Sequence, residues 1–412
     1  MLTNKERLLN LMDRYALDGV VASTPENILY MSGFSSWRQR YYRRAETQVY
    51  VVFPRDQRDA PALLIAGGDE EYASHQEIWL KEIYAYGRSG KSKPPEGAEF
   101  TAEEERFAAL MDAPVMGGKH VEALAELIRK KGLGKSRLGI DEFNLPEGTL
   151  QVLGSLLPGA RILPASNFFL YVQMVKTAAE IERLRQAARL NQSAADAVLR
   201  RCRPGITEGE LVSVYSEEIS RPGGQVCWLH MVAGRGGNFP PSKDHVVAKG
   251  NIFRTDMGCR LEGYHADTCR SACVGTPTDK HRRVFDALQS GVLRSVERLR
   301  PGALPSELFE IMLQGVRSGG MPDYKRNFLG HLIGLEARGF PFSLGPAKEV
   351  KDPLLPPTTD VPMEPDMVVN IEASEHELGW GSVSVEYTLL VTEKGYEHLI
   401  PPYQMLHTLP LT

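Results

Sequence analysis

The segment from Thr255 to Arg270 is the feature that most restricts the fold. It contains two runs of strand-forming residues on either side of residues 261–263, which we expect to form a tight turn. In a simple hairpin centred on this turn, Asp256 and Asp267 lie directly opposite each other. Two opposed carboxylates repel, so either a cation lies between them or one of them holds a proton. A divalent metal ion would resolve the repulsion, although two solvated aspartates near a turn fit this segment equally well.

The length and composition are those of an ordinary two-domain globular protein. At 412 residues the chain is too long for a single typical core. Its hydrophobic content is 42% and its charged content is 24%, as in other globular proteins. The net charge of -4 lacks the basic excess of a dedicated nucleic-acid binder, so we expect no nucleic-acid partner.

No segment predicts export or insertion into a membrane. The N-terminal residues lack the apolar run of a signal peptide, and no run approaches the roughly 18 uncharged apolar residues of a membrane span. The cysteines are odd in number and contain no C-x-x-C pair, so we expect free thiols rather than a disulfide framework or a thiolate zinc site. These features predict a cytoplasmic protein without a membrane partner.

Alternating strands and helices predict a small α/β domain over residues 1–170. The predicted strands are 19–22, 49–53, 62–66 and 137–141, and the predicted helices are 5–16, 102–111 and 119–131.

The densest basic run of this domain is Arg38–Arg44. A solvated loop is the simpler interpretation of such a run. Arginine forks also suit carboxylates, and interleaved tyrosines can stack on ligands, so Arg40 and Arg43 are candidates for an anion-recognition loop.

A second domain is predicted over residues 171–412. It opens with two capping-box patterns, at 177–180 and 207–210, each followed by a helical pattern. Two more helices are expected at about 279–299 and 305–317. From residue 325 onward we expect mostly strand and loop, so this domain is predicted to be α+β.

Three more potential metal ligands lie in the second domain. His331 follows a glycine in an apolar segment, and Glu372 and Glu386 each interrupt a strand rich in β-branched residues. Singly, each is more often a strand-end charge or an ordinary core histidine, although a carboxylate on a buried strand needs compensation. Together with Asp256 and Asp267 they offer four carboxylates and one imidazole. This donor set balances two divalent cations and suits Mn, Co, Fe or Zn better than Ca.

In these residues the chain resembles the pita-bread metallohydrolases, the family of prolidase, aminopeptidase P, methionine aminopeptidase and creatinase. The family's ordered pattern D-x-G, D-x-x-R, G-H, E and E matches Asp256/Gly258, Asp267/Arg270, Gly330/His331, Glu372 and Glu386. Residues 27–34 and 176–181 also resemble segments of the two-domain creatinase and prolidase branch. The resemblance covers the whole chain and implies an α/β N-terminal domain plus an α+β pita-bread catalytic domain.

The resemblance implies a role for each ligand. Asp267 and Glu386 would bridge two divalent ions, Mn being the first choice. Asp256 would chelate one ion, and His331 and Glu372 would complete the other. Glu372 would also carry a proton from the attacking water to the leaving nitrogen.

The resemblance also implies a homodimer, because two-domain members generally form dimers. In such a dimer the N-terminal domain of one chain approaches the active site of the other. Arg40 and Arg43 would then bind substrate in trans.

Outside the ligand set, the chain departs from the peptidases of this family. Phe239 and Arg338 stand where the peptidases carry two histidines that bind and protonate the substrate. Ser384 stands where they carry an arginine. An arginine cannot shuttle protons as a histidine does, but Arg338 could clamp a substrate carboxylate and act directly in catalysis. The metal site is thus expected to be kept while the residues that handle the peptide are replaced.

Three histidines could replace the missing pair. His265 is the first candidate, because it lies two residues before Asp267 and therefore on the same strand face. His230 and His245 are alternatives, and any of the three could be an ordinary histidine. Tyr387, next to Glu386, is a further candidate substrate contact.

We therefore predict a dinuclear metal-dependent hydrolase that cleaves a C–N, amide-type bond in a small anionic or zwitterionic substrate, in the manner of an Xaa-Pro peptidase. One alternative is a true Xaa-Pro dipeptidase or aminopeptidase with substituted accessory groups. Another is a metal-dependent lyase on the same fold, resembling dimethylsulfoniopropionate lyase, in which a base removes a proton. A non-catalytic binding protein ranks last, because such relatives usually lose ligands and all five are present here.

Overall fold

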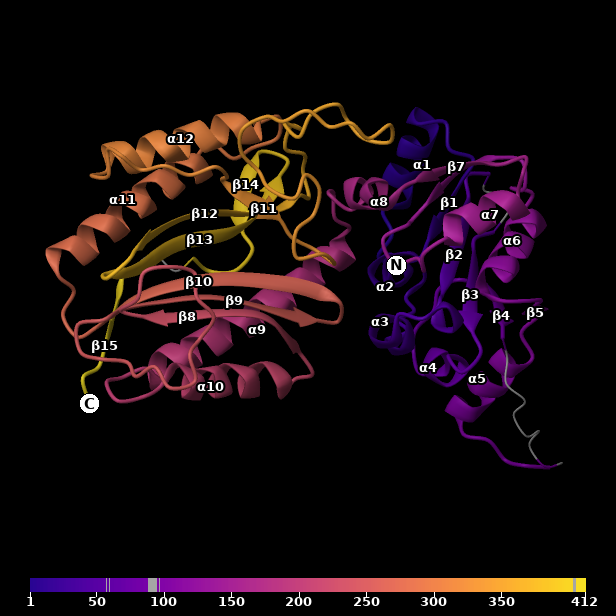
Figure 1. Cartoon of the computed structure of the whole chain (residues 1–412), viewed down its shortest axis with the longest axis horizontal. Helices are drawn as coiled ribbons and strands as arrows, with labels where there is room; N and C mark the ends of the chain where they lie inside the picture. The colour runs from indigo at the N-terminus through magenta and orange to yellow at the C-terminus, as the bar shows by residue number, and fades with distance from the viewer. Residues whose placement is uncertain (57, 59, 88–94, 96, 403–404) are drawn as a thin grey trace. The chain divides into compact units, whose positions relative to one another are not determined.

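The described part of the chain forms two compact units. The computed structural model describes residues 1–412 except 57, 59, 88–94, 96, 403 and 404 (Figure 1). The N-terminal unit is Met1–Val172 and the C-terminal unit is Gln173–Thr412. In the part of the chain that is described, no helix combines the length and apolarity needed to cross a bilayer.

A seven-stranded mixed sheet forms the centre of the N-terminal unit. Its strands are β1 (Gly19–Ala22), β2 (Tyr50–Pro54), β3 (Ala62–Ala66), β4 (Glu82–Tyr86), β5 (Val115–Met116), β6 (Arg137–Ile140) and β7 (Arg161–Pro164). Their order is β5-β4-β3-β2-β1-β6-β7. The helices are α1 (Lys5–Arg14), α2 (Pro25–Ser32), α3 (Trp37–Tyr42), α4 (Glu70–Ser74), α5 (Ala102–Met111), α6 (His120–Lys130), α7 (Thr149–Leu156) and α8 (Ser166–Val172), with a 3-10 turn at Ala45–Thr47.

Sequence periodicity accounts for most of this unit. Each predicted strand and helix is present, with its ends within two residues of the expected ones. On α6, Val121, Leu124, Leu127 and Ile128 recur at helical spacing and are buried in the core that the sheet forms. The expected α/β character of the unit is therefore confirmed.

The basic run at Arg38–Arg44 is mostly helical, so the predicted loop is wrong. Ser36 caps α3, because its Oγ accepts a hydrogen bond from the backbone N–H of Gln39 at 3.1 Å. The helix ends at Arg43, which adopts a left-handed φ of 52°. The helix was missed because this charged segment has no apolar periodicity. The serine before it is the one sequence signal of its start.

Two four-stranded sheets form the interior of the C-terminal unit. One contains β8 (Gln225–Ala233), β9 (Ile252–Leu261), β10 (Tyr264–Val274) and β15 (His407–Leu409), in the order β15-β10-β9-β8. The other contains β11 (Gly330–Leu332), β12 (Val368–Glu377), β13 (Gly381–Thr392) and β14 (Gly395–His398), in the order β11-β12-β13-β14. Strand β13 contacts both β9 and β10, so the two sheets face each other.

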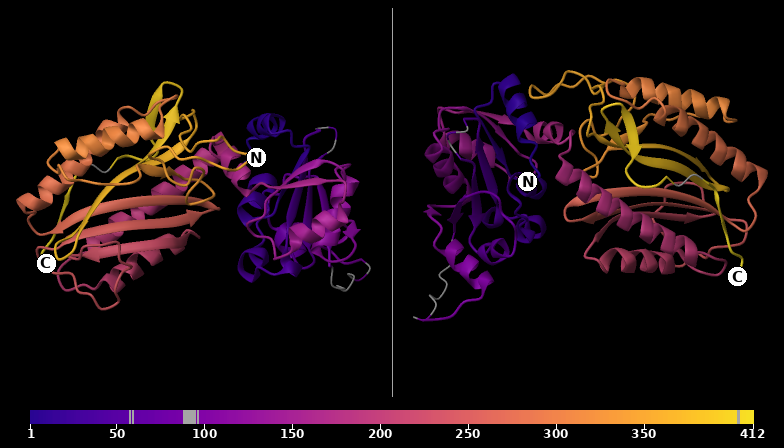
Figure 2. Two further views of the ribbon diagram at one scale, coloured as in Figure 1. Left: turned by 45° about the horizontal axis from the view of Figure 1, so that its top comes forward. Right: turned by 180° about the vertical axis from the view of Figure 1, so that it is seen from behind.

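Two pairs of helices cover the outer faces of these sheets (Figures 1 and 2). Helices α9 (Ala178–Arg201) and α10 (Glu208–Ser220) pack on the first sheet, and α11 (Asp279–Val296) packs on the second, with α12 (Pro305–Ser318) against α11. The two predicted capping boxes are confirmed at Thr177 and Thr207, which start α9 and α10. The helices expected near 279 and 305, and the strand-rich remainder, are confirmed as well.

The turn between β9 and β10 is shorter than predicted. Leu261 pairs with Tyr264, so Glu262 and Gly263 alone form the turn. Their φ angles are 47° and 91°. Positive φ at both positions is typical of the type I′ turn, which matches the twist of a two-residue hairpin.

This turn shifts the register of the two aspartates. Asp256 lies opposite Cys269, and Asp267 lies opposite Gly258. The predicted direct opposition of Asp256 and Asp267 is therefore wrong. Because side chains alternate along a strand, both aspartates still lie on one face, as diagonal neighbours.

Candidate metal centre

A cavity of about 220 Å³ opens between the two sheets of the C-terminal unit. It is lined by Trp228, His230, Asn238, Asp256, Asp267, Cys269, His331, Ala337, Arg338, Glu372 and Glu386. The structure thus brings all five predicted metal ligands to one cavity, from strands of both sheets.

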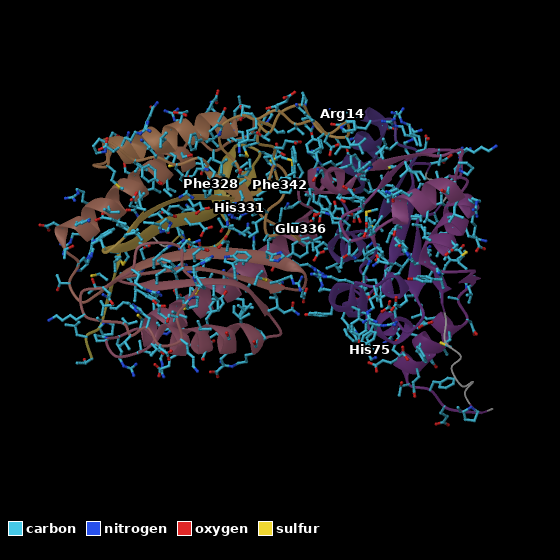
Figure 3. The ribbon with its side chains drawn as sticks, viewed as in Figure 1. Arg14, His75, Phe328, His331, Glu336 and Phe342 are labelled. Carbon is cyan, nitrogen blue, oxygen red and sulfur yellow. The ribbon has the colours of Figure 1, made fainter. Side chains whose placement is uncertain are left out.

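Asp267, His331 and Glu386 form the tightest group of donors. One ligand atom from each lies within 4.8 Å of the others, and His331 Nε2 is 3.4 Å from Asp267 Oδ2. His331 is buried among the strands of the C-terminal unit (Figure 3). Its Nδ1 lies 3.2 Å from the carbonyl oxygen of Leu332, which can only accept a hydrogen bond. The proton is therefore on Nδ1, and the lone pair of Nε2 is available to a metal ion.

Glu372 and Glu386 are the carboxylates that lie directly opposite each other. They pair in register on β12 and β13, in the arrangement that we expected for the two aspartates. Each has a polar side chain close to one of its oxygens. Asn370 Nδ2 donates to Glu386 Oε1 at 2.9 Å, and Arg326 Nη2 lies 3.0 Å from Glu372 Oε2.

Both oxygens of Asp256 are held by neighbouring side chains. Arg254 Nη2 is 2.6 Å from Asp256 Oδ2, and Trp228 Nε1 donates to Asp256 Oδ1 at 3.2 Å. The indole of Trp228 lies directly over Gly258, where an added Cβ would be 2.1 Å from the ring. The glycine of the D-x-G pattern thus gives Trp228 the room to reach Asp256.

Two carboxylate oxygens in the cavity lack compensation. Asp267 Oδ1 and Glu386 Oε2 are buried and have no hydrogen-bond partner among the described residues. Burial raises the pKa of both carboxyl groups well above the usual range, and the neighbouring carboxylates raise each pKa further. Oxygen and imidazole donors that converge with unpaired lone pairs fit one or more divalent cations.

Arg338 lies at the same cavity and has no ion pair in the described part of the chain. Its guanidinium carbon is 5.9 Å from the centre of the Phe328 ring. The guanidinium carbon of Arg326 also lies over the Phe328 ring, 4.0 Å from its centre. An exposed guanidinium held beside an aromatic ring is suited to bind an anion that enters the cavity.

The three candidate histidines occupy different places. His265 does not line the cavity; it stacks on Trp228, with ring centroids 6.2 Å apart and planes 21° apart. His245 contacts the carbonyl oxygen of Ala233 at 2.9 Å. His230 does line the cavity, because it lies beside Asp256 in the β8–β9 ladder. Of these three histidines, His230 is thus the one that lines the cavity.

Phe239 and Tyr387 are not among the residues that line the cavity. Phe239 is 42% exposed and lies under the guanidinium of Arg235, while its neighbour Asn238 faces the cavity. Tyr387 is buried beside His398, because it points to the face of β13 opposite Glu386.

Arg40 and Arg43 lie in the N-terminal unit. Arg40 Nη1 is 2.5 Å from Glu26 Oε1, and Arg43 Nε donates to the carbonyl oxygen of Arg40 at 3.4 Å. Arg40 therefore already has an anionic partner. A contact of Arg40 or Arg43 with substrate stays a prediction.

Four polar residues of the site were missed in the sequence. Arg254 and Asn370 each lie two residues before a predicted ligand, so strand alternation alone would have placed them on the ligand face. Arg326 and Trp228 had no such signal. Arg326 lies outside any strand, and Trp228 follows an irregularity in the β8–β9 pairing.

Comparison with protein families bears directly on this arrangement. The model of the creatinase/prolidase N-terminal domain matches residues 5–187, and that of metallopeptidase family M24 matches residues 182–393, about half of the chain. The chain belongs to metallopeptidase family M24. The predicted enzyme class, a metal-dependent hydrolase of the prolidase type, is confirmed. M24 membership implies divalent metal ions and a peptide-like substrate.

Similar proteins include two Xaa-Pro dipeptidases. The chain is 25% identical over 319 residues to that of Lactobacillus delbrueckii subsp. lactis, covering 75% of this chain and 83% of the relative. It is 22% identical over 400 residues to that of Pyrococcus furiosus, covering 96% of each.

Solved structures show that the likeness extends over the whole fold. The prolidase of Pyrococcus horikoshii matches with a TM-score of 0.73 and 18% identity, covering 97% of this chain and 99% of its own. The X-Pro aminopeptidase of Thermotoga maritima matches with a TM-score of 0.75 and 17% identity, again covering 97% and 99%. The predicted fold, a creatinase-type α/β domain plus a pita-bread catalytic domain, is therefore confirmed.

Proposed function

We propose that this M24 protein is a dinuclear hydrolase that cleaves a C–N, amide-type bond in a small anionic or zwitterionic substrate. One observation carries the proposal. A cavity of about 220 Å³ combines five metal-type donors with Arg338, an arginine that has no ion-pair partner among the described residues. The donors suit hydrolysis, and Arg338 suits a substrate that carries a negative charge.

The two metal ions would be held by Asp256, Asp267, His331, Glu372 and Glu386. Mn is the first choice, and Zn, Co or Fe suit the same donors. When bound, such ions lower the pKa of water and polarise the scissile carbonyl.

The chain's own residues would supply binding and proton transfer. Arg338 binds the substrate carboxylate, and its contact with Phe328 limits the directions in which the guanidinium can point. Glu372 takes up a proton from water and returns it to the leaving nitrogen. Arg326, 3.0 Å from Glu372 Oε2, holds that carboxylate in one position for both steps.

A true Xaa-Pro dipeptidase is the second candidate, because two of the relatives described above carry that name. Purified protein loaded with Mn should be tested on Gly-Pro and Ala-Pro, and on small amide and ureido compounds with a free carboxylate. We expect slow cleavage of the dipeptides and faster cleavage of at least one of the other compounds. Rapid dipeptide cleavage would support the second candidate instead, and an alkene product would identify a lyase.

The role of Arg338 is tested with the best substrate of that screen. Replacing Arg338 by Ala should raise KM by about 30- to 100-fold and change kcat less, because a charged hydrogen bond to the substrate is lost. Arg294→Ala, which removes an exposed arginine of α11, is the matched control and should leave both constants unchanged. An unchanged KM in Arg338→Ala would remove the reason for expecting an anionic substrate.

We also propose two domains, 1–170 and 171–412, and a homodimer in which Arg40 and Arg43 bind substrate in trans. Sedimentation should give a dimer mass. Mixing an Arg40→Ala/Arg43→Ala chain with an Asp267→Asn chain should restore up to about a quarter of native activity, because one of the two sites in a mixed dimer is intact. No recovery in dimers shown to mix would contradict the trans arrangement.

A further inference from the structure

Arg254 is a buried cation next to the metal-type carboxylates. It lies on β9 two residues before Asp256 and is only 2% exposed. Its Nη2 lies 2.6 Å from Asp256 Oδ2, and its Nε donates to Ser384 Oγ at 2.6 Å. Its Nη1 donates to Asn238 Oδ1. Three of its nitrogens are thus engaged by partners from two strands and a loop.

A buried guanidinium is costly unless its partners are close and well oriented. Removing a cation of this size from water is unfavourable, and only good geometry with its partners offsets that loss of hydration. The planar fork of arginine can contact several acceptors at once without further loss of side-chain freedom. Two of the three acceptors, Asp256 and Asn238, line the cavity, and Ser384 lies on β13. The contacts of Arg254 therefore fix the positions of side chains in the site.

Ser384 shows why a guanidinium fits at this place. It lies on β13 two residues before Glu386, and its small side chain leaves room for Arg254 to cross from the opposite sheet. The Ser384 hydroxyl accepts from Arg254 and donates to Ser374 Oγ at 3.0 Å. A long side chain at position 384 would therefore occupy the space that Arg254 now fills.

We propose that Arg254, on β9, is the positioning residue for Asp256. An arginine at position 384, on β13, would reach the same space from the facing strand and take over this role. Together with Trp228, which donates to the other oxygen, it holds the Asp256 carboxylate in one orientation toward the cavity. This inference rests on the proposed assignment of Asp256 as a metal ligand.

The consequence is a dependence of metal affinity on Arg254 that does not require Arg254 to touch the metal. Without the guanidinium, Asp256 gains rotational freedom and must be ordered when the ion binds. Loss of a residue that orients a ligand typically costs about 10- to 100-fold in metal affinity. An arginine supplied from position 384 should recover that loss, because it reaches the same space from the facing strand.

The test is Mn²⁺ binding by calorimetry to the full-length metal-free protein. The variants are Arg254→Leu, Arg254→Leu/Ser384→Arg, and Arg254→Lys as a form that keeps the buried charge. Ser384→Ala is the matched control, because it removes one acceptor and leaves the Asp256 contact. Thermal unfolding in EDTA is measured for each variant, so that changes in fold stability are separated from changes in metal affinity.

We expect Arg254→Leu to weaken Mn²⁺ binding by about 10- to 100-fold, and the double variant to regain at least about tenfold of it. Arg254→Lys should lie between native and Arg254→Leu, because an ammonium cannot reproduce the fork. Native affinity in Arg254→Leu overturns the proposal, as does a folded double variant with no recovery. If Arg254→Leu does not fold, native affinity in Arg254→Lys overturns it. Asp256→Asn tests the ligand assignment separately: native Mn²⁺ stoichiometry there defeats the proposed function, whatever Arg254 does.

Discussion

Asp141 in the N-terminal unit and the pair Asp267–Glu386 in the C-terminal unit have buried carboxylate oxygens in opposite surroundings. Asp141 Oδ2 accepts from the backbone N–H groups of Ser23 and Thr24 at 3.0 and 2.7 Å. It also accepts from Thr24 Oγ1 and Asn27 Nδ2, each at 2.8 Å, and Asp141 Oδ1 accepts from Ser166 Oγ at 2.7 Å. Both oxygens of Asp141 thus accept hydrogen bonds from the protein.

In the pair of the C-terminal unit, one oxygen of each carboxylate lacks such donors. Asp267 Oδ1 and Glu386 Oε2 have none in the described chain, and their nearest neighbours include other carboxylates. Burial is therefore no guide to function, since Asp141 is buried too. What separates the two regions is whether the fold itself supplies the positive or hydrogen-bonding partners. Where several metal-type donors converge without such partners, as at Asp267 and Glu386, a cation is the missing component.

The largest expected difference between the two regions is in metal binding. We expect Asp267→Asn to abolish binding of Mn²⁺ and to lower kcat/KM by at least about a thousandfold, because the site loses a ligand of both proposed ions. Metal analysis and kinetics on the same preparation measure both effects. Without metal, this variant should unfold at a higher temperature than native protein, because a buried repulsive charge is gone. Retained activity would undo the ligand assignment.

The reverse result is expected for Asp141. Replacing it by Asn puts an NH2 group or a single acceptor against several donors, which should lower the free energy of unfolding by about 4 kcal/mol. Urea unfolding followed by circular dichroism measures this change. Metal stoichiometry should stay native in the folded variant. A loss of metal there would show that the two regions are not independent, and the comparison would fail.

The sequence alone predicted the local elements of the two regions, but not the tertiary contacts that distinguish them. Periodicity and capping boxes were sufficient for the strands, for α9 and α10, and for the strand positions of the four carboxylate ligands, because these features depend on neighbours along the chain. Strand patterning alone could not separate Asp141 from Glu386, since both lie next to apolar strand residues; only the resemblance to a family pattern did. Their difference lies in the donors that tertiary folding brings, such as Ser166 to Asp141 and Asn370 to Glu386.

The register of the β9–β10 hairpin shows a second limit. One residue more or less in the turn changes which side chains are opposed. Glu262 adopts a positive φ, which is uncommon for a residue other than glycine and could not be predicted from its type. The placement of Phe239 shows a third. A matching position in a motif did not put the side chain in the cavity, because the loop turns Asn238 inward instead.

Asp69 provides a finer test of the comparison. It is a buried carboxylate of the N-terminal unit whose Oδ2 has no partner in the described residues, and burial raises its pKa to about 6. The groups that act on it are Ser36, Arg38, Glu70 and Glu71, with Tyr86 nearby. Because its folded pKa lies above the unfolded value of 3.8, its contribution to stability is full below about pH 4 and is lost as the pH rises to about 6.

The difference in free energy of unfolding between native protein and Asp69→Asn, called the stability gap, should therefore change by up to about 3 kcal/mol between pH 4 and pH 6.5. Native protein loses stability relative to the variant as the pH rises. Urea unfolding at several pH values measures the gap. Asp69→Asn should leave metal stoichiometry unchanged, because Asp69 belongs to no group of metal-type donors among the described residues. A gap that does not vary with pH would show that Asp69 is ionised in the fold despite its burial.

The smallest expected effect concerns the donor to Asp256. Trp228→Phe keeps a ring over Gly258 but removes the indole N–H that lies 3.2 Å from Asp256 Oδ1. We expect about a tenfold weaker affinity for Mn²⁺ and little change in stability, because only one of the contacts that orient the carboxylate is lost. Trp380→Phe is the matched control, since Trp380 packs on His281 and Lys280 and does not line the cavity. If both variants bind Mn²⁺ equally well, Arg254 alone orients Asp256. The hydrogen bond from Trp228 would then contribute nothing to metal binding.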